Sequence, residues 1–189
     1  MTEATMSGII NGIDVDRLGQ TAQAIRQNPG LGKSQFRAAN RWIIGGHNRS
    51  TIQGFYIAGQ EDTTRTAPFV LDADEPPVLL GTDLGANPVE HVLHALAACL
   101  TTSIVCHAAA RGIRIESIES KLEGDLDLQG FLGLSDKVRR GYEGIRVSFT
   151  IKSDAPAEQL KALTAFSPVH DIVSNPVPVT ITVSTQPTA

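Results

Sequence analysis

The sequence predicts an α+β protein in which mostly antiparallel strands pack against one long, buried helix. Three observations support this fold class. An alanine-rich apolar run lies near the middle of the 189-residue chain, alternating strand-like segments lie on both sides of it, and no repeat or linker interrupts them. The length suits one domain with a substantial core. We therefore expect an N-terminal helical arm over residues 1–33 and a single domain over residues 34–189.

The first part of the chain predicts one helix followed by strands. Residues 13–28 carry apolar side chains at helical spacing, and the PGLG that follows predicts the end of that helix. Residues 34–44 and 49–59 flank GGHN, a turn signal that predicts a β-hairpin. Residues 66–83 predict a short strand, a proline-rich turn and a second short strand.

The apolar run predicts a central helix over residues 88–111. Asn87 suits the N-cap, and Pro88 suits the first helical position. Arg111 and then Gly112 suit the C-terminal end of a helix. Such a helix is about 35 Å long. Because it is apolar on almost all sides, we expect it to be buried at the centre of the fold.

The remaining elements alternate between strands and short helices. Residues 113–128 and 145–153 alternate in polarity and predict two strands. Residues 155–166 predict a helix, and residues 167–175 predict a second, short helix. The alternating VPVTITVST over residues 177–185 predicts a closing strand.

Charge and composition argue against several classes of protein. Sixteen basic and twenty acidic residues give a net charge of −4 without a cluster of Lys or Arg, so we expect neither nucleic acid nor a membrane surface as a partner. The N-terminus lacks the features of a signal peptide, and polar residues interrupt the longest apolar region. Only two cysteines are present, which indicates a reducing compartment. We expect a soluble, cytoplasmic protein.

The two cysteines lie in the central helix, seven positions apart. Cys99 and Cys106 therefore share a face, with their Cα atoms about 10 Å apart. A disulfide requires less than about 7 Å, so they cannot bridge each other within an intact helix. Cysteines of this kind are most often small core residues. Cys99 lies too far from the helix N-terminus to be activated by the dipole, so a reactive Cys99 needs a cationic side chain from elsewhere.

Two further groups of polar residues have structural explanations. Glu90, His91 and His94 lie within two helical turns but lack a zinc-binding pattern, so we expect no metal and no cofactor. SPVHD, residues 167–171, contains Ser, His and Asp, but neighbouring residues on a helix point about 100° apart and cannot form a catalytic triad. Ser167 followed by proline suits an N-cap instead. A cysteine at that position would have a lowered pKa.

Several segments together resemble the OsmC/Ohr family of hydroperoxide-reducing proteins. They are ANPVEHVLHALAACL, the helix end AAARGI, the strand IESIESKLEGDLDL, and FSPVHDIVSNPVPVTITV. The resemblance covers roughly residues 36–185. It implies an intertwined homodimer, in which antiparallel sheets from both subunits wrap around two long buried central helices. Two sites would lie at the dimer interface.

The resemblance also implies roles for individual residues. Cys99 takes the place of the cysteine that attacks the peroxide as a thiolate. Arg49 takes the place of the family's activating arginine, with Arg41 as the alternative. The family's Asn-Pro-Glu is Asn-Pro-Val here, so the acid lies one residue later, at Glu90. His94 and Cys106 are secondary candidates for the site.

One departure from the family pattern affects the chemistry. The resolving cysteine of the family's Cys-Pro-Val is Ser167 here, and a serine cannot form a disulfide with Cys99. We therefore consider a one-cysteine thiol peroxidase of the oxidative stress response, with peroxiredoxin-like activity, which reduces a small hydrophobic hydroperoxide and depends on an external thiol reductant. The alternative is a catalytically quiet relative that binds a small apolar ligand at the dimer interface.

Overall fold

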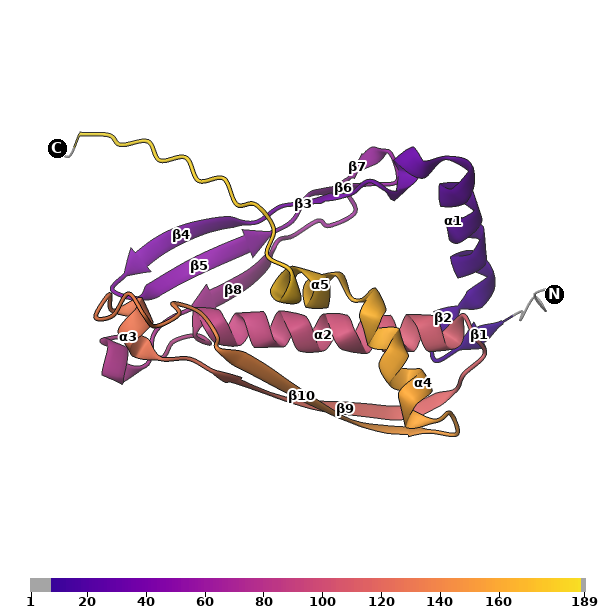
Figure 1. Ribbon diagram of the computed structural model, residues 1–189. Helices are drawn as coiled ribbons and strands as arrows, with labels where there is room; N and C mark the ends of the chain where they lie inside the picture. Colours follow the sequence, from indigo (N-terminus) through magenta and orange to yellow (C-terminus); the bar gives the residue numbers. More distant parts are fainter. Residues whose placement is uncertain (1–7, 188–189) are drawn as a thin grey trace.

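The computed structural model describes residues 8–187 and confirms the α+β class (Figure 1). All six strand pairs among these residues are antiparallel. Figure 1 shows one sheet on one side of the long helix α2 and a two-stranded hairpin on the other side.

The part of the chain before the long helix is mostly β structure. Its elements are β1 (Ile9–Ile10), β2 (Ile13–Asp14), α1 (Val15–Gln27), the 3-10 helix η1 (Pro29–Gly32), β3 (Gln35–Phe36), β4 (Ala39–Ile44), β5 (His47–Ile52), β6 (Phe55–Ile57), β7 (Gln60–Asp62), β8 (Phe69–Ala73) and the 3-10 helix η2 (Pro77–Leu79). From the long helix onward the elements are α2 (Pro88–Ala109), β9 (Ile115–Asp125), α3 (Leu128–Phe131), β10 (Gly144–Ser153), α4 (Ala157–Ala162), the 3-10 helix η3 (Leu163–Phe166) and α5 (Pro168–Ser174).

The strands of the described residues form three sheets besides a small β1–β2 pair. β4 and β5 form the hairpin that GGHN predicted, and Gly45 takes a positive φ of 56° in its turn. β8 pairs with the other edge of β5, which gives the order β4-β5-β8. The short strands form a second sheet in the order β3-β6-β7, and β9 pairs with β10.

Helix α2 begins at Pro88 as predicted and ends at Ala109, two residues before the predicted end. Asn87 and Glu90 form a capping box at its start, and the backbone turns at Gly112 with a φ of 72°. By length and composition α2 is apolar enough to cross a membrane, as core helices of water-soluble folds also are. Here it packs against β9, η3 and α5. The central core cluster consists of Ile104, Ala108, Leu160 and Leu163.

The single chain buries less than the sequence led us to expect. Its accessible surface is 14235 Å², whereas a folded monomer of 20.1 kDa exposes about 8,700 Å². Helix α2 is buried on one face only, and a second face remains exposed along Val92, Ala95, Ala98 and Thr102. The expectation of a helix buried on all sides is therefore wrong for one chain, because the described elements supply no layer over that face.

Two predicted strands are not formed. The second short strand expected before α2 is the 3-10 helix η2, because Pro76 and Pro77 remove two backbone donors at this point. Residues 177–185 form no strand and pair with no other strand among the described residues. Their apolar residues Val179 and Ile181 are 76% and 81% exposed. Polar and apolar residues alternate in this segment as in a strand, but within one chain the segment does not pair with the edge of a sheet.

Candidate functional site

Cys99 lies on α2 at the border between its buried and exposed faces. The residue is half-buried and free, whereas its neighbour Leu100 points into the core. Positions spaced by four residues share a helix face, so Cys99 lies on one stripe with the buried Ser103 and with His107. This stripe leads from Cys99 toward the segment that packs across the C-terminal half of α2.

Ser167 lies beside this stripe. The preceding residue, Phe166, stacks on His107 with ring centroids 4.0 Å apart. Three residues after Ser167, His170 lines the same cavity as Leu100. Ser167 therefore lies alongside α2 between the levels of Leu100 and His107, on the C-terminal side of Cys99. Its side chain is 1% exposed, and its Oγ accepts a hydrogen bond from the His170 N–H at 3.1 Å, as the predicted N-cap does.

Arg49 is bound to a carboxylate that the sequence did not single out. Its Nε and Nη2 donate to the two oxygens of Asp72 at 2.9 and 3.1 Å. His47 Nε2 lies 2.8 Å from the same carboxylate. The hydrogen bond from Arg49, and then that from His47, lower the pKa of Asp72. His91 Nε2 lies 3.2 Å from the Asp72 carbonyl oxygen, so this cluster lies above the first turn of α2.

The other charged candidates lie apart from this cluster. The Glu90 carboxylate accepts the Asn87 N–H at 2.8 Å and thus closes the capping box, without a bond to Arg49. Arg41 faces Arg49 across the β4–β5 hairpin and is exposed. The structure brings Arg49 to Asp72 and brings neither arginine to Glu90. Asp72 is recognisable only from the pairing of β8 with β5, which places it opposite Arg49. The sequence alone does not give this pairing.

The secondary candidates lie at the two ends of α2. His94 is exposed near its start, and Cys106 is half-buried and free near its end. Burial, and then the nearby Arg111 charge, lower the pKa of His107 beside Cys106. Within residues 8–187, no group of three His, Cys, Asp or Glu side chains could hold a metal ion.

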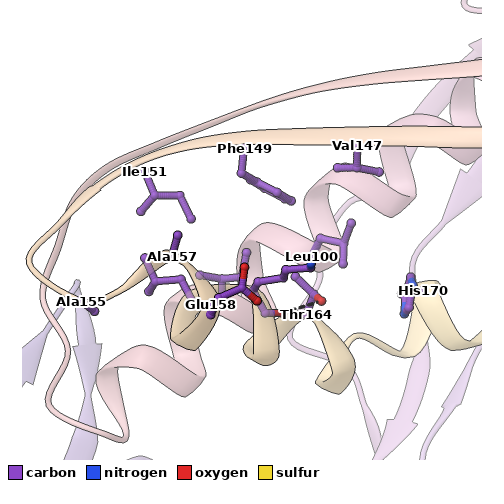
Figure 2. A pocket seen from close by; sticks show the side chains of 12 residues that line it. Leu100, Val147, Phe149, Ile151, Ala155, Ala157, Glu158, Thr164 and His170 are labelled. Carbon is purple, nitrogen blue, oxygen red and sulfur yellow. Dashed lines mark hydrogen bonds between the residues drawn. The ribbon is translucent and has the colours of Figure 1, made fainter.

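An open apolar cavity of about 510 Å³ adjoins the turn that carries Cys99. Figure 2 shows Val147, Phe149 and Ile151 of β10 on one side of it and Leu100 of α2 on the other. Glu158, Lys161, Thr164 and His170 add polar groups. The alternating positions of Val147, Phe149 and Ile151 predict the inner face of a strand from the sequence. They do not predict which residues lie on the other side of the cavity. The arrangement could hold an apolar molecule close to the Cys99 turn.

Comparisons with known proteins agree with this fold. Residues 81–182 match a family model described as OsmC-like protein. The structure resembles an OsmC-like protein from Mycoplasma pneumoniae, with a TM-score of 0.56 at 18% identity over 75% of this chain and 89% of that chain. An OsmC-like protein of unknown function from Vibrio cholerae gives 0.52 at 13% identity over 77% and 94%. An organic hydroperoxide resistance protein, OsmC, from Legionella pneumophila gives 0.47 at 18% identity over 74% and 89%. No curated protein matches.

Proposed function

The chain belongs to the OsmC-like protein family, and from this premise we propose that it is a thiol-dependent redox protein of the oxidative stress response. Cys99 is the nucleophile, and its substrate is a small hydrophobic hydroperoxide. The single observation that carries the proposal is the placement of the free, half-buried Cys99 on the α2 stripe that leads to Ser167. The two free cysteines fit a reducing, cytoplasmic setting.

The reaction needs one cysteine and an external reductant. The Cys99 thiolate attacks one oxygen of the hydroperoxide, the O–O bond breaks, and an alcohol leaves after protonation. Cys99 becomes a sulfenic acid. Since Ser167 offers no thiol, a small external thiol condenses with the sulfenic acid, releases water and forms a mixed disulfide. A second thiol then restores Cys99 and leaves as an external disulfide.

The cation that stabilises the thiolate is Arg49, with Arg41 as the second choice. Arg49 is oriented by two hydrogen bonds to Asp72, which a flexible arginine otherwise lacks. Glu90 stabilises the start of α2 through the capping box and acts on the site through that helix. His94 and Cys106 have no role in the proposed step.

The proposed working unit is a homodimer. The chain exposes about 5,500 Å² more surface than a folded monomer of its mass is expected to expose. An excess of this size is more than one chain contributes to the interface of an obligate dimer, which buries about 2,000–5,000 Å² in total over both partners. The exposed face of α2 borders Cys99, so a second copy that covers this face would also enclose the cysteine.

A second candidate function rests on the apolar cavity. The cavity of about 510 Å³ lies beside the Cys99 turn and has the size and lining of a small-molecule site. A catalytically quiet relative that binds a small apolar ligand would use this space without any chemistry at Cys99.

Oxidation by a hydroperoxide separates the two functions. The full-length protein is treated with increasing tert-butyl hydroperoxide in the presence of a small thiol, and its mass and peroxide consumption are followed. We expect rapid consumption and a mixed disulfide at Cys99. Cys99→Ser should abolish both, whereas the matched control Cys106→Ser should retain both. Equal consumption by wild type and Cys99→Ser would leave only the ligand-binding function.

A further inference from the structure

Helix α1 has an apolar stripe that its own chain covers only in part. Val15, Leu18, Ala22 and Ile25 recur at helical spacing, yet no residue of this 13-residue helix is buried. Its main contacts are with β2 and η1, its neighbours in sequence. Isolated helices of this length are marginal in water, and most of their stability comes from packing of the apolar face. The stripe therefore requires a partner surface.

The position of α1 is fixed from its base. Asn11 donates from Nδ2 to the Ile113 carbonyl at 2.9 Å, and its Oδ1 accepts the Ile115 N–H at 2.8 Å. The neighbouring Ile10 is 4% exposed. These contacts attach the arm to the segment that follows α2, so α1 stands beside the C-terminal end of α2 (Figure 1). The arm is held away from the rest of its own chain.

A second group of exposed apolar side chains lies in two loops at the opposite end of α2. We define it as the end patch: Val78, Leu80, Leu84, Phe131, Leu132 and Leu134. All six side chains are more than half exposed, and Leu80 reaches 91%. Their loops are tied to the start of α2, because Asn87 Nδ2 donates to Glu75 and the Tyr142 hydroxyl donates to the Val89 carbonyl at 2.8 Å. Figure 1 shows α3 at this end, opposite to α1.

The loop that carries Leu80 is held rigidly in this exposed form. The buried Asp74 carboxylate accepts hydrogen bonds from the Thr82 hydroxyl at 2.7 Å, from the Thr82 N–H at 3.1 Å and from the Leu84 N–H at 3.2 Å. Leu80 itself has a φ of 63°, a conformation that bulky residues rarely adopt. Such strain persists only where the surrounding structure fixes it, and it is often found at functional contacts.

The two apolar surfaces cannot meet within one chain. The 22 residues of α2 separate them by about 33 Å. A twofold axis that crosses the exposed face of α2 at a right angle reverses the helix, and thus places the C-terminal end of one copy beside the N-terminal end of the other. In such an isologous dimer each pairing occurs twice. The surplus accessible surface described above is large enough to include both contacts.

We propose that α1 of one copy packs its Val15–Ile25 stripe on the end patch of a second copy. The inference rests on the proposed homodimer and extends it, since residues 81–182 are the part that matches the family model and α1 lies outside them. The arm then clasps the partner across the dimer. The partner that covers the α1 stripe is therefore a second copy of this chain and not a different protein.

Disulfide trapping tests this contact. In a full-length background with Cys99→Ser and Cys106→Ser, Ile25→Cys and Leu80→Cys are introduced together and oxidised mildly. We expect a dimer linked between positions 25 and 80 of different copies, because a disulfide forms only when the Cα atoms are within about 7 Å. The matched control combines Leu80→Cys with Gln20→Cys, on the opposite side of α1, and should remain unlinked.

Other linkages overturn the proposal. The proposal is contradicted if positions 25 and 80 link within one chain, or if only 25–25 or 80–80 links form. It is also contradicted if the Ile25→Cys pair links no more than the Gln20→Cys control does. A second test uses Leu18→Glu with Ile25→Glu in the full chain, which should raise the dimer dissociation constant at least tenfold by analytical ultracentrifugation, whereas Gln20→Glu should not. Association unchanged by these glutamates overturns the contact. Neither test depends on the hydroperoxide chemistry, because the trapped protein contains no Cys99 and the second test measures association alone.

Discussion

Replacing Ser167 by cysteine tests whether the buried start of α5 faces Cys99. Ser167 lies between Phe166, which stacks on His107 of α2, and His170, which lines the same cavity as Leu100 of α2. We expect the introduced cysteine to form a disulfide with Cys99 after oxidation. This change would convert the proposed one-cysteine chemistry into a two-cysteine cycle.

The structure sets the size of the effect on stability. The Ser167 hydroxyl caps α5 by accepting the His170 N–H, and loss of such a cap costs about 1 kcal/mol. A disulfide to Cys99 closes a loop of about 68 residues, which stabilises the fold by about 4 kcal/mol in the chain-entropy model. Reduced Ser167→Cys should therefore be about 1 kcal/mol less stable than wild type, and the oxidised form about 3 kcal/mol more stable.

Urea unfolding with and without dithiothreitol measures this difference, and peptide mapping identifies the bond. Ser167→Ala is the matched control: it should lose the cap energy and show no dependence on redox state. Adding Cys106→Ser should leave the bond intact. If oxidation produces no link between Cys99 and the introduced cysteine, the two positions are too far apart, and the α2 stripe does not define the site.

Three further changes test the fold and its electrostatics. Ile104→Ala, at a side chain 1% exposed, should lower the free energy of unfolding by about 2–5 kcal/mol in urea titrations. Hydrogen bonds, first that from the Thr82 hydroxyl, hold the pKa of Asp74 at about 2. Above pH 3.8, the ordinary pKa of an aspartate, the ionised Asp74 therefore stabilises the fold, and this stabilisation is lost as the pH falls toward 2. Asp74→Asn should lower the Tm at pH 7, and the Tm of this variant should decline less than that of wild type between pH 3.8 and pH 2. Arg111→Met should raise the pKa of His107, which burial and then the Arg111 charge lower, as an NMR titration would show.

The sequence predicted the elements whose signals are local. The extent of α2 followed from Asn87, Pro88 and Gly112, because capping and backbone conformation act within one turn. The β4–β5 hairpin followed from GGHN for the same reason. The strand expected over residues 177–185 was not formed, because alternation specifies a face and not the edge with which a strand pairs.

The candidate site divides in the same way. The cap at Ser167 was predictable, since the hydroxyl bonds to a backbone group three residues away. The partner of Arg49 was not, because β5 and β8 bring Asp72 opposite it from 23 positions further along the chain. The resemblance placed Glu90 in the site, whereas in the structure its carboxylate closes the capping box of α2. The roles of Cys99 and Arg49 in catalysis remain predictions.

The exposed surface connects the arm, the unpaired C-terminal segment and Cys99. Within residues 8–187, eight hydrophobic residues are buried, which is a small core for a chain of this length. The exposed large apolar residues gather on β4 and β8, in the end patch and over residues 177–183, and the exposed side of α2 adds Val92. Because Cys99 borders the exposed side of α2, a partner that covers this side also controls water and substrate access to the thiol. Association and Cys99 chemistry would then depend on the same surface, so the dimer would form part of the proposed site.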